Sequence, residues 1–240
     1  MNIKHFKLAV FDLDGTLVEY GSGQVTPATL ETIKMLPDNG IRVVIATGRS
    51  WKQTKAIADQ LKVQTPVIVQ SGAIILDPVT ERMIKIAPLR PEIDRKLPGL
   101  IKNTGIDEFC LLETGAYYTN QVNTSGGKWL FENGEDCRIG VPDLANQKVV
   151  KRLLIGSEAQ LIPISKRIEE LKPAPNTILW PPDQLTDDWF LEIFDPLASK
   201  GQALAWLADY LEVDCERIIA FGDGFNDLDL LQTAGYGVAM

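Results

Sequence analysis

Residues 10–17 read Val-Phe-Asp-Leu-Asp-Gly-Thr-Leu, and this stretch is the strongest indication of the fold. The apolar run from Leu8 to Phe11 leads into it, which is typical of a buried parallel strand that ends at a glycine-bearing turn. Asp12 and Asp14 then follow at the carboxyl end of the strand, where open α/β sheets place their ligand chemistry. Two carboxylates this close repel each other unless a cation or a shared proton offsets the repulsion.

A second apolar run, from Ile41 to Ala46, ends in Thr47 and Gly48. The Thr47 hydroxyl and the Gly48 amide would face the same edge of the sheet, and both are neutral donors suited to a phosphate oxygen. Ser50 has the position of an N-cap for the next helix. Taken alone, this segment favours a plain helix-capping turn over a phosphate site.

A third segment, Ser199-Lys200-Gly201, begins a helix with Ser199 as its N-cap. Lys200 falls in the first turn, where a cation is unfavourable against the helix dipole. Its position makes sense if an anion binds at this helix terminus. Considered by itself, however, Lys200 is better interpreted as a solvated surface residue.

The fourth segment is an apolar run, Ile218–Phe221, that leads into Gly-Asp-Gly-Phe-Asn-Asp. An Asx-rich helix start would explain Asn226 and Asp227 but leaves Asp223 unexplained. Together, the four strand ends supply carboxylates, one ammonium group and neutral donors. Such a set needs a hard cation with oxygen ligands, and Mg²⁺ is the preferred one. These are the groups that phosphoryl transfer requires.

The order DxDGT, TG, a lone Lys and GDxxND is similar to that of the haloacid dehalogenase-like hydrolases. The strings GDGFND, TGR and AGYGVAM most resemble the Cof-type phosphatase branch of that superfamily. The resemblance covers the whole chain, with its strong motifs in residues 7–76 and 190–240. It departs from the branch at Ser71, where Asn is usual. The family also usually continues past Met240, so the sequence is either a fragment or a protein with a smaller sheet.

The resemblance implies a role for each motif residue. Asp12 would attack phosphorus and become an aspartyl-phosphate, while Asp14 would protonate the leaving oxygen and later activate water. Phosphate binding would involve Thr47, Gly48, Lys200 and Asn226. Mg²⁺ would be held by Asp12, the backbone carbonyl of Asp14 and Asp223. Asp227 would either bind the metal directly or support the residues that bind it. The implied activity is Mg²⁺-dependent hydrolysis of a small phosphorylated metabolite, with a sugar phosphate as one candidate. Two alternatives stay open: a phosphosugar mutase, and a non-catalytic phospholigand-binding protein, which the intact Asp12 and Asp14 disfavour.

The segment between the motif-bearing parts has a different sequence pattern. Its clearest element is a helix after Ser157, in which apolar residues recur at gaps of three and four. Further strands are expected at 109–113, 153–155 and 177–180, a helix at 91–101, a polar loop at 120–128, and hinges at Pro78 and 180–183. This pattern resembles the cap of the Cof branch. We therefore expect an α/β fold with a doubly wound, mostly parallel Rossmann-like sheet formed by residues 1–81 and 187–240, with 82–186 as an inserted α/β cap domain.

The composition of the chain restricts which partners and which cellular compartment we expect. The chain of 240 residues has 24 Lys and Arg against 32 Asp and Glu, a formal net charge of −8, which disfavours a nucleic-acid surface. No apolar run has the length of a membrane span. The first strand follows the start directly, so we expect no signal peptide. Cys110, Cys137 and Cys215 are odd in number and widely spaced, which is typical of reduced thiols in a cytoplasmic protein. His5 is the single His and lies outside every motif, so a His-based triad is excluded. The sequence does not indicate an oligomeric state.

Overall fold

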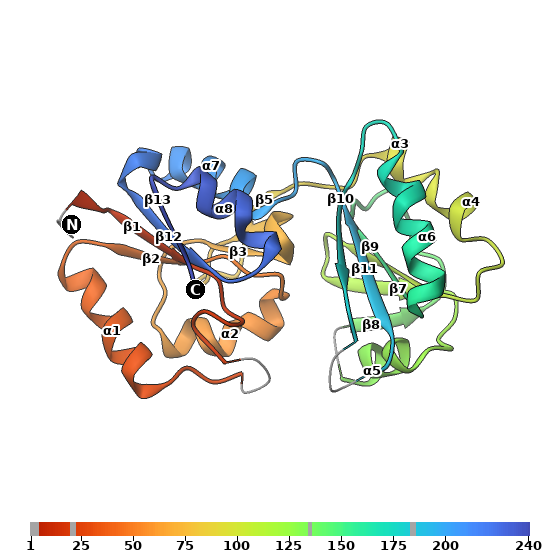
Figure 1. The fold of residues 1–240 in the computed structure, drawn as a ribbon, viewed down its shortest axis with the longest axis horizontal. Helices are drawn as coiled ribbons and strands as arrows, with labels where there is room; N and C mark the ends of the chain where they lie inside the picture. The colour runs from red at the N-terminus through yellow and green to blue at the C-terminus, as the bar shows by residue number, and fades with distance from the viewer. Residues whose placement is uncertain (1–4, 20–22, 134–135, 183–185) are drawn as a thin grey trace. The chain divides into compact units, whose positions relative to one another are not determined.

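The chain forms two units in the computed structural model, which describes residues 5–19, 23–133, 136–182 and 186–240 (Figure 1). The first unit comprises residues 1–86 and 198–240, and the second comprises residues 87–197. The expected boundaries at 81/82 and 186/187 therefore shift to 86/87 and 197/198. The hinge expected at 180–183 lies partly outside the described residues.

The first unit is built on a parallel sheet whose central strand is β1 (Leu8–Phe11). β12 (Ile218–Gly222) pairs with one edge of β1 and β2 (Arg42–Ile45) with the other, and β13 (Tyr236–Ala239) pairs with β12. The strand order is β13-β12-β1-β2, and every pair in it is parallel. All carboxyl ends therefore meet at one edge, so residues that follow β1, β2 and β12 come together.

Helices cover both faces of this sheet, as a doubly wound fold requires (Figure 1). Successive residues of a strand point to opposite faces. Leu8 and Val10 of β1 pack with α7 (Lys200–Tyr210) and α8 (Leu228–Thr233). Ala9 and Phe11 face α1 (Pro27–Asp38) on the other side, where α2 (Trp51–Gln60) also lies. The expectation of an α/β fold with a mostly parallel, doubly wound sheet is confirmed.

A smaller antiparallel sheet extends the first unit beyond β2. It has the order β3-β4-β5, with β3 at Val67–Val69, β4 at Ile74–Leu76 and β5 at Met83–Ile86. A parallel bridge between Ala46 and Ile68 sets β3 beside the end of β2. β5 was expected to belong to the insertion, but its pairing with β4 makes it part of the first unit.

The second unit contains a six-stranded sheet with the order β10-β11-β9-β6-β7-β8. All its pairs are antiparallel except β7 with β8. The strands are β6 (Asp107–Leu112), β7 (Ala116–Thr119), β8 (Asp136–Ile139), β9 (Val149–Gly156), β10 (Asn176–Trp180) and β11 (Trp189–Phe194). Three helices pack their apolar side chains on one face: α3 (Pro91–Asp94), α4 (Leu97–Ile101) and α6 (Glu158–Glu169).

Most expected elements of the second unit exist, with three corrections. The single helix expected at 91–101 is two short helices, and Pro98 lies in the first turn of the second, where proline is tolerated. The polar loop expected at 120–128 instead enters α5 (Ser125–Asn133). β11 was assigned to the parallel core, but it lies between β9 and β10. An apolar strand fits either sheet by pattern, so only its pairing could place it.

No helix among the described residues is long and apolar enough to cross a membrane. All three cysteines are free; Cys110 is buried, and Cys137 and Cys215 are half-buried. Burial raises the pKa of the Cys110 thiol to about 12, so this thiol is inert at neutral pH.

Candidate functional site

Asp12 stands directly after β1, at the edge where the parallel strands end. Its backbone N–H donates to the carbonyl of Phe221 at 3.0 Å, which continues the pairing of β1 with β12 by one residue. The side chain is buried, although a carboxylate is rarely buried unless it is paired. The position of Asp12 is therefore fixed by the sheet, and its burial has to be explained by a partner.

That partner is Lys200, which begins α7. Its Nζ donates to Asp12 Oδ1 and to Asp227 Oδ1, both at 2.6 Å. The Lys200 residue is only 1% exposed, so its interpretation as a solvated surface residue is wrong. The Ser199 side chain caps the helix by accepting from the Gln202 N–H at 3.2 Å. Two carboxylates thus offset the unfavourable position of a cation at a helix N-terminus.

The loop after β12 supplies the second carboxylate of this cluster. Asp227 is buried and its Oδ2 accepts from the Gly224 N–H at 3.0 Å. Gly222 must be a glycine here, because a Cβ on it would lie 2.6 Å from the Asp227 side chain. Asn226 is half-buried and folds back over Gly224, while Asp223 is exposed. The loop therefore presents one exposed and one buried carboxylate at the same strand end.

These carboxylates form a group that fits a metal ion. One oxygen each from Asp12, Asp223 and Asp227 can be chosen so that all three lie within 4.8 Å of one another. Three carboxylates minus one ammonium leave two negative charges, which one divalent cation would balance. Oxygen ligands of this kind suit Mg²⁺. The Asp14 carboxylate pairs with Arg49; the metal contact predicted for Asp14 is through its backbone carbonyl and does not involve this side chain.

The electrostatics of Asp12 reflect its burial. Burial raises the pKa of Asp12 from 3.8 to about 6; the Lys200 ammonium opposes this shift and the neighbouring Asp227 carboxylate adds to it. Asp12 is therefore mostly ionised at pH 7, as a nucleophile or metal ligand must be. Ionisation of this group nevertheless costs folding free energy in the metal-free protein.

This shift predicts a pH dependence of stability. Because the folded-state pKa is raised, the favourable contribution of neutral Asp12 is present below about pH 4 and is lost as the pH rises through about 6. Asp12→Asn cannot ionise, so its stability relative to the wild-type protein should increase over that window, by up to about 3 kcal/mol for a shift of about two units. Chemical denaturation of both metal-free proteins at about pH 4, 5, 6 and 7 measures the difference. This range covers the unfolded and the folded pKa of Asp12.

Asp77→Asn is a matched control with the opposite sign. Backbone N–H groups of Thr80 and Val79 lower the pKa of Asp77, so its contribution is present above the unfolded pKa and is lost as the pH falls. If the stability of Asp12→Asn relative to the wild-type protein does not change between about pH 4 and 7, the raised pKa of Asp12 is contradicted.

The loop after β2 holds the predicted phosphate donors beside a second loop. Thr47 is fully buried, and its carbonyl accepts from the Ser71 N–H at 3.0 Å. A Cβ on Gly48 would lie 3.3 Å from Ser71 Oγ. Gly72 in turn lies against the backbone of Ser199, where a Cβ would overlap the carbonyl oxygen at 2.1 Å. Residues 70–72 therefore link the Thr47 loop to the start of α7.

Backbone strain also marks this connecting loop. Gln70 and Ser71 both adopt positive φ, at 50° and 53°, which residues with a Cβ rarely do. Gly72 follows with a φ of 94°. Strain of this kind clusters at functional sites, where the surrounding structure maintains it. The loop thus maintains the spacing between the two predicted phosphate-binding segments.

Arg49 is a site residue that the sequence reasoning missed. Its Nε donates to Asp14 Oδ2 at 2.9 Å and its Nη2 donates to Asp14 Oδ1, which makes a bidentate pair. The Arg49 N–H also donates to Thr47 Oγ1 at 3.2 Å. The only sequence signal was its place directly after Thr47-Gly48, and that spacing does not identify a partner across the sheet.

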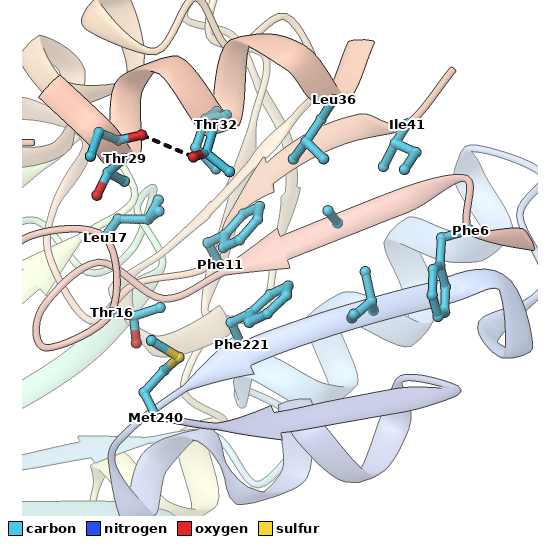
Figure 2. A pocket seen from close by; sticks show the side chains of 14 residues that line it. Phe6, Phe11, Thr16, Leu17, Thr29, Thr32, Leu36, Ile41, Phe221 and Met240 are labelled. Atoms are coloured by element: carbon cyan, nitrogen blue, oxygen red, sulfur yellow. Dashed lines mark hydrogen bonds between the residues drawn. The ribbon is translucent and has the colours of Figure 1, made fainter. Parts of the chain in front are cut away.

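An apolar pocket of the first unit is separate from this chemistry. Its volume is about 560 Å³, and it lies between α1 and the β1–β12 face of the sheet (Figure 2). Phe11 and Phe221 stack in it with ring centroids 4.8 Å apart. None of its lining residues is charged. It therefore offers no group for acid–base or nucleophilic catalysis.

Comparisons with known proteins identify the family of the chain. A family model described as haloacid dehalogenase-like hydrolase matches residues 9–240. A candidate phosphatase of Haemophilus influenzae is 30% identical over 240 residues, covering 98% of this chain and 87% of that protein. The 5-amino-6-(5-phospho-D-ribitylamino)uracil phosphatase YitU of Bacillus subtilis is 27% identical over 258 residues, covering 100% of this chain and 88% of that protein.

Solved structures show the same fold. A haloacid dehalogenase-like hydrolase from Bacteroides thetaiotaomicron superposes with a TM-score of 0.78 at 26% identity, covering 98% of this chain and 88% of that one. A subclass IIB sugar phosphatase superposes with the same TM-score, 0.78, at 22% identity, covering 98% and 87%. At that identity the second likeness concerns the fold alone.

Proposed function

Since the chain belongs to the haloacid dehalogenase-like hydrolases, a family in which its relatives are phosphoric monoester hydrolases, we propose that it is a Mg²⁺-dependent phosphatase. Its substrate is a small phosphorylated metabolite, with sugar and polyol phosphates as the favoured class. The observation that supports this most is the buried Lys200 between Asp12 and Asp227 at a strand end, with Asp223 in reach. The phosphoribityl substrate in the name of YitU supports the substrate class.

In the proposed reaction Asp12 is the nucleophile. One of its carboxylate oxygens attacks phosphorus, a bond forms between that oxygen and phosphorus, and the bond from phosphorus to the leaving oxygen breaks. Asp14 donates its proton to the leaving oxygen. In the second half, Asp14 takes a proton from water, the water oxygen bonds to phosphorus, and the aspartyl–phosphorus bond breaks. Phosphate leaves and both carboxylates return to their starting state.

The remaining predicted residues bind and orient the phosphoryl group. The Lys200 ammonium is already aimed at Asp12, so it would meet a phosphoryl oxygen beside the nucleophile. The Thr47 hydroxyl, the Gly48 amide and the Asn226 amide are assigned to the other oxygens. Asp12, Asp223, Asp227 and the Asp14 carbonyl would hold the metal. A bound Mg²⁺ neutralises negative charge, which lets a phosphate dianion approach a carboxylate nucleophile.

We assign substrate selection to the second unit, residues 87–197, as a cap. This assignment rests on the resemblance of its inserted α/β pattern to the Cof-type caps. Exchanging residues 87–197 for the corresponding unit of a relative should change the preferred phosphate ester. A preference that stays with the first unit in such an exchange would refute the assignment.

The proposed activity predicts metal-dependent phosphate release. We expect hydrolysis of para-nitrophenyl phosphate with Mg²⁺ and loss of this hydrolysis with excess chelator, because the carboxylate cluster repels an anionic substrate without a cation. Initial rates of phosphate release in both conditions measure this, and a panel of sugar, polyol and nucleoside phosphates then identifies the substrate. Equal rates with Mg²⁺ and with chelator would exclude the metal from the reaction.

A further inference from the structure

The bidentate pair between Arg49 and Asp14 orients the Asp14 carboxyl group as well as balancing its charge. Two N–H groups on one edge of the guanidinium donate to the two oxygens of one carboxylate, and this arrangement fixes the plane of the carboxyl group. The pair is accessible: the side chains of Arg49 and Asp14 are 24% and 34% exposed. Solvent can therefore reach it.

The base of the Arg49 side chain is held rigidly. Its backbone N–H donates to Thr47 Oγ1 at 3.2 Å, and its carbonyl accepts from the Gln70 N–H at 2.9 Å. The next residue, Ser50, caps α2 and exchanges hydrogen bonds with Gln53. Arg49 is therefore fixed to the loop that contains the predicted phosphate donors and to the helix that follows it.

Asp14 has a less constrained position. It lies beyond the end of β1, in a turn where Gly15 has a φ of 81° and its N–H donates to the Val18 carbonyl at 2.8 Å. These contacts hold the backbone, whereas a surface aspartate side chain can adopt several rotamers. A proton-transfer group must come within about 2.6–3.2 Å of the oxygen it serves. The bidentate pair selects one orientation of the Asp14 carboxyl group from those available.

The pair also leaves Asp14 able to react. Each carboxylate oxygen has two lone-pair sites, and the guanidinium occupies one on each oxygen. In the first half of the reaction one remaining site carries the proton that Asp14 donates to the leaving oxygen, and in the second half a remaining site accepts the proton from water. Lysine could not replace Arg49, since an ammonium group is a point charge without the planar pair of donors.

We propose that Arg49 is a positioning residue for Asp14: it holds the acid–base carboxyl group in one orientation and thereby acts on proton transfer without touching the phosphoryl group. The inference rests on the proposed function, because it assumes that Asp14 transfers the proton. It assigns to Arg49 a contribution that depends on Asp14 and on the basicity of the leaving group.

A double-mutant cycle tests this dependence. The single variants are Arg49→Ala and Asp14→Asn, and the double variant combines them. The substrates are phenyl phosphate, whose leaving group is strongly basic, and para-nitrophenyl phosphate, whose leaving group is weakly basic and needs little protonation. We expect Arg49→Ala to lower kcat on phenyl phosphate by about 10- to 100-fold, which is part of the 10²–10⁴-fold typical of positioned proton transfer.

Arg49→Ala should lower kcat on para-nitrophenyl phosphate by less and should leave KM near its wild-type value. In the Asp14→Asn background, Arg49→Ala should lower kcat by less than about twofold further. Arg49→Lys should not restore the rate. Arg42→Ala is the matched control: Arg42 is also half-buried and donates to the Leu211 carbonyl at 3.2 Å, at the opposite end of β2. It should lower the unfolding midpoint without changing the ratio of the rates on the two substrates.

Three results would overturn the proposal. An equal loss on both substrates, a loss that persists in the Asp14→Asn background, or a rise in KM with unchanged kcat would each show that Arg49 acts on the phosphoryl group or the fold. Unfolding midpoints of all variants identify a fold effect directly. Failure of the proposed function is distinguishable, because either the wild-type protein would then release no phosphate or Asp12→Asn would keep the wild-type rate, whatever Arg49 does.

Discussion

Asp12→Asn is expected to abolish turnover, by about 10⁴-fold or more, as removal of a covalent nucleophile does in other enzymes. Asparagine has nearly the same shape, so the side chain can still lie at the end of β1 beside Lys200. Its amide lacks the negative charge that attacks phosphorus and that a metal ligand supplies. Initial rates with Mg²⁺ at about pH 7 measure the loss. This pH is about one unit above the raised pKa of Asp12.

Two other variants show whether the loss is specific. Asp38→Asn changes an exposed carboxylate at the end of α1 and should leave the rate unchanged. Asp14→Asn should lose about 10²–10⁴-fold, and less with a good leaving group. An Asp12→Asn protein that keeps a wild-type rate, after the exclusion of contaminating phosphatases, would mean that another residue is the nucleophile.

Lys200→Met is expected to affect stability as well as turnover. Two carboxylates, Asp12 and Asp227, share the buried ammonium at 2.6 Å each, so its removal leaves them without a counter-charge. Breaking a buried ion pair in this way typically costs about 3–5 kcal/mol. Denaturant unfolding of the metal-free protein measures the loss, and Mg²⁺ should recover part of it by binding the folded state.

A double variant separates charge balance from the shape of the lysine side chain. Combining Lys200→Met with Asp227→Asn removes one unpaired carboxylate, so the double variant should be more stable than Lys200→Met alone. Its turnover should stay low, because the proposed phosphate contact is still missing. If the double variant is instead as unstable as the sum of the two single changes, the charges are not coupled and the cluster does not work as described.

The positions of the backbone at the site were predictable from local patterns. The apolar runs before Asp12, Thr47 and Asp223 are short and end in glycine-bearing turns, and parallel strands bring such ends to one edge. Lys200 could be placed at a helix start by its Ser199 cap. These features depend on residues next to each other in the chain, so the sequence contains them directly.

The partners of the side chains could not be predicted in the same way. The burial of Lys200 depends on Asp12 and Asp227, which lie far from it in the chain, while local composition favoured a surface position. The pairing of Arg49 with Asp14 depends on the turn at Gly15 and on the start of α2 together. Strand β11 shows the same limit, since its apolar pattern fits a parallel or an antiparallel sheet and only its neighbours decide between them.

The most direct test of the central claim is to locate the phosphoryl group during the reaction. Asp14→Asn should still be phosphorylated by para-nitrophenyl phosphate, which needs little protonation, but it lacks the base that releases the group. Rapid acid quench of this variant, followed by proteolysis and mass spectrometry, should find a phosphoryl group on Asp12 in an amount close to that of the enzyme. A phosphoryl group on any other residue, or turnover with none on the protein, would contradict the assignment of Asp12 as the nucleophile.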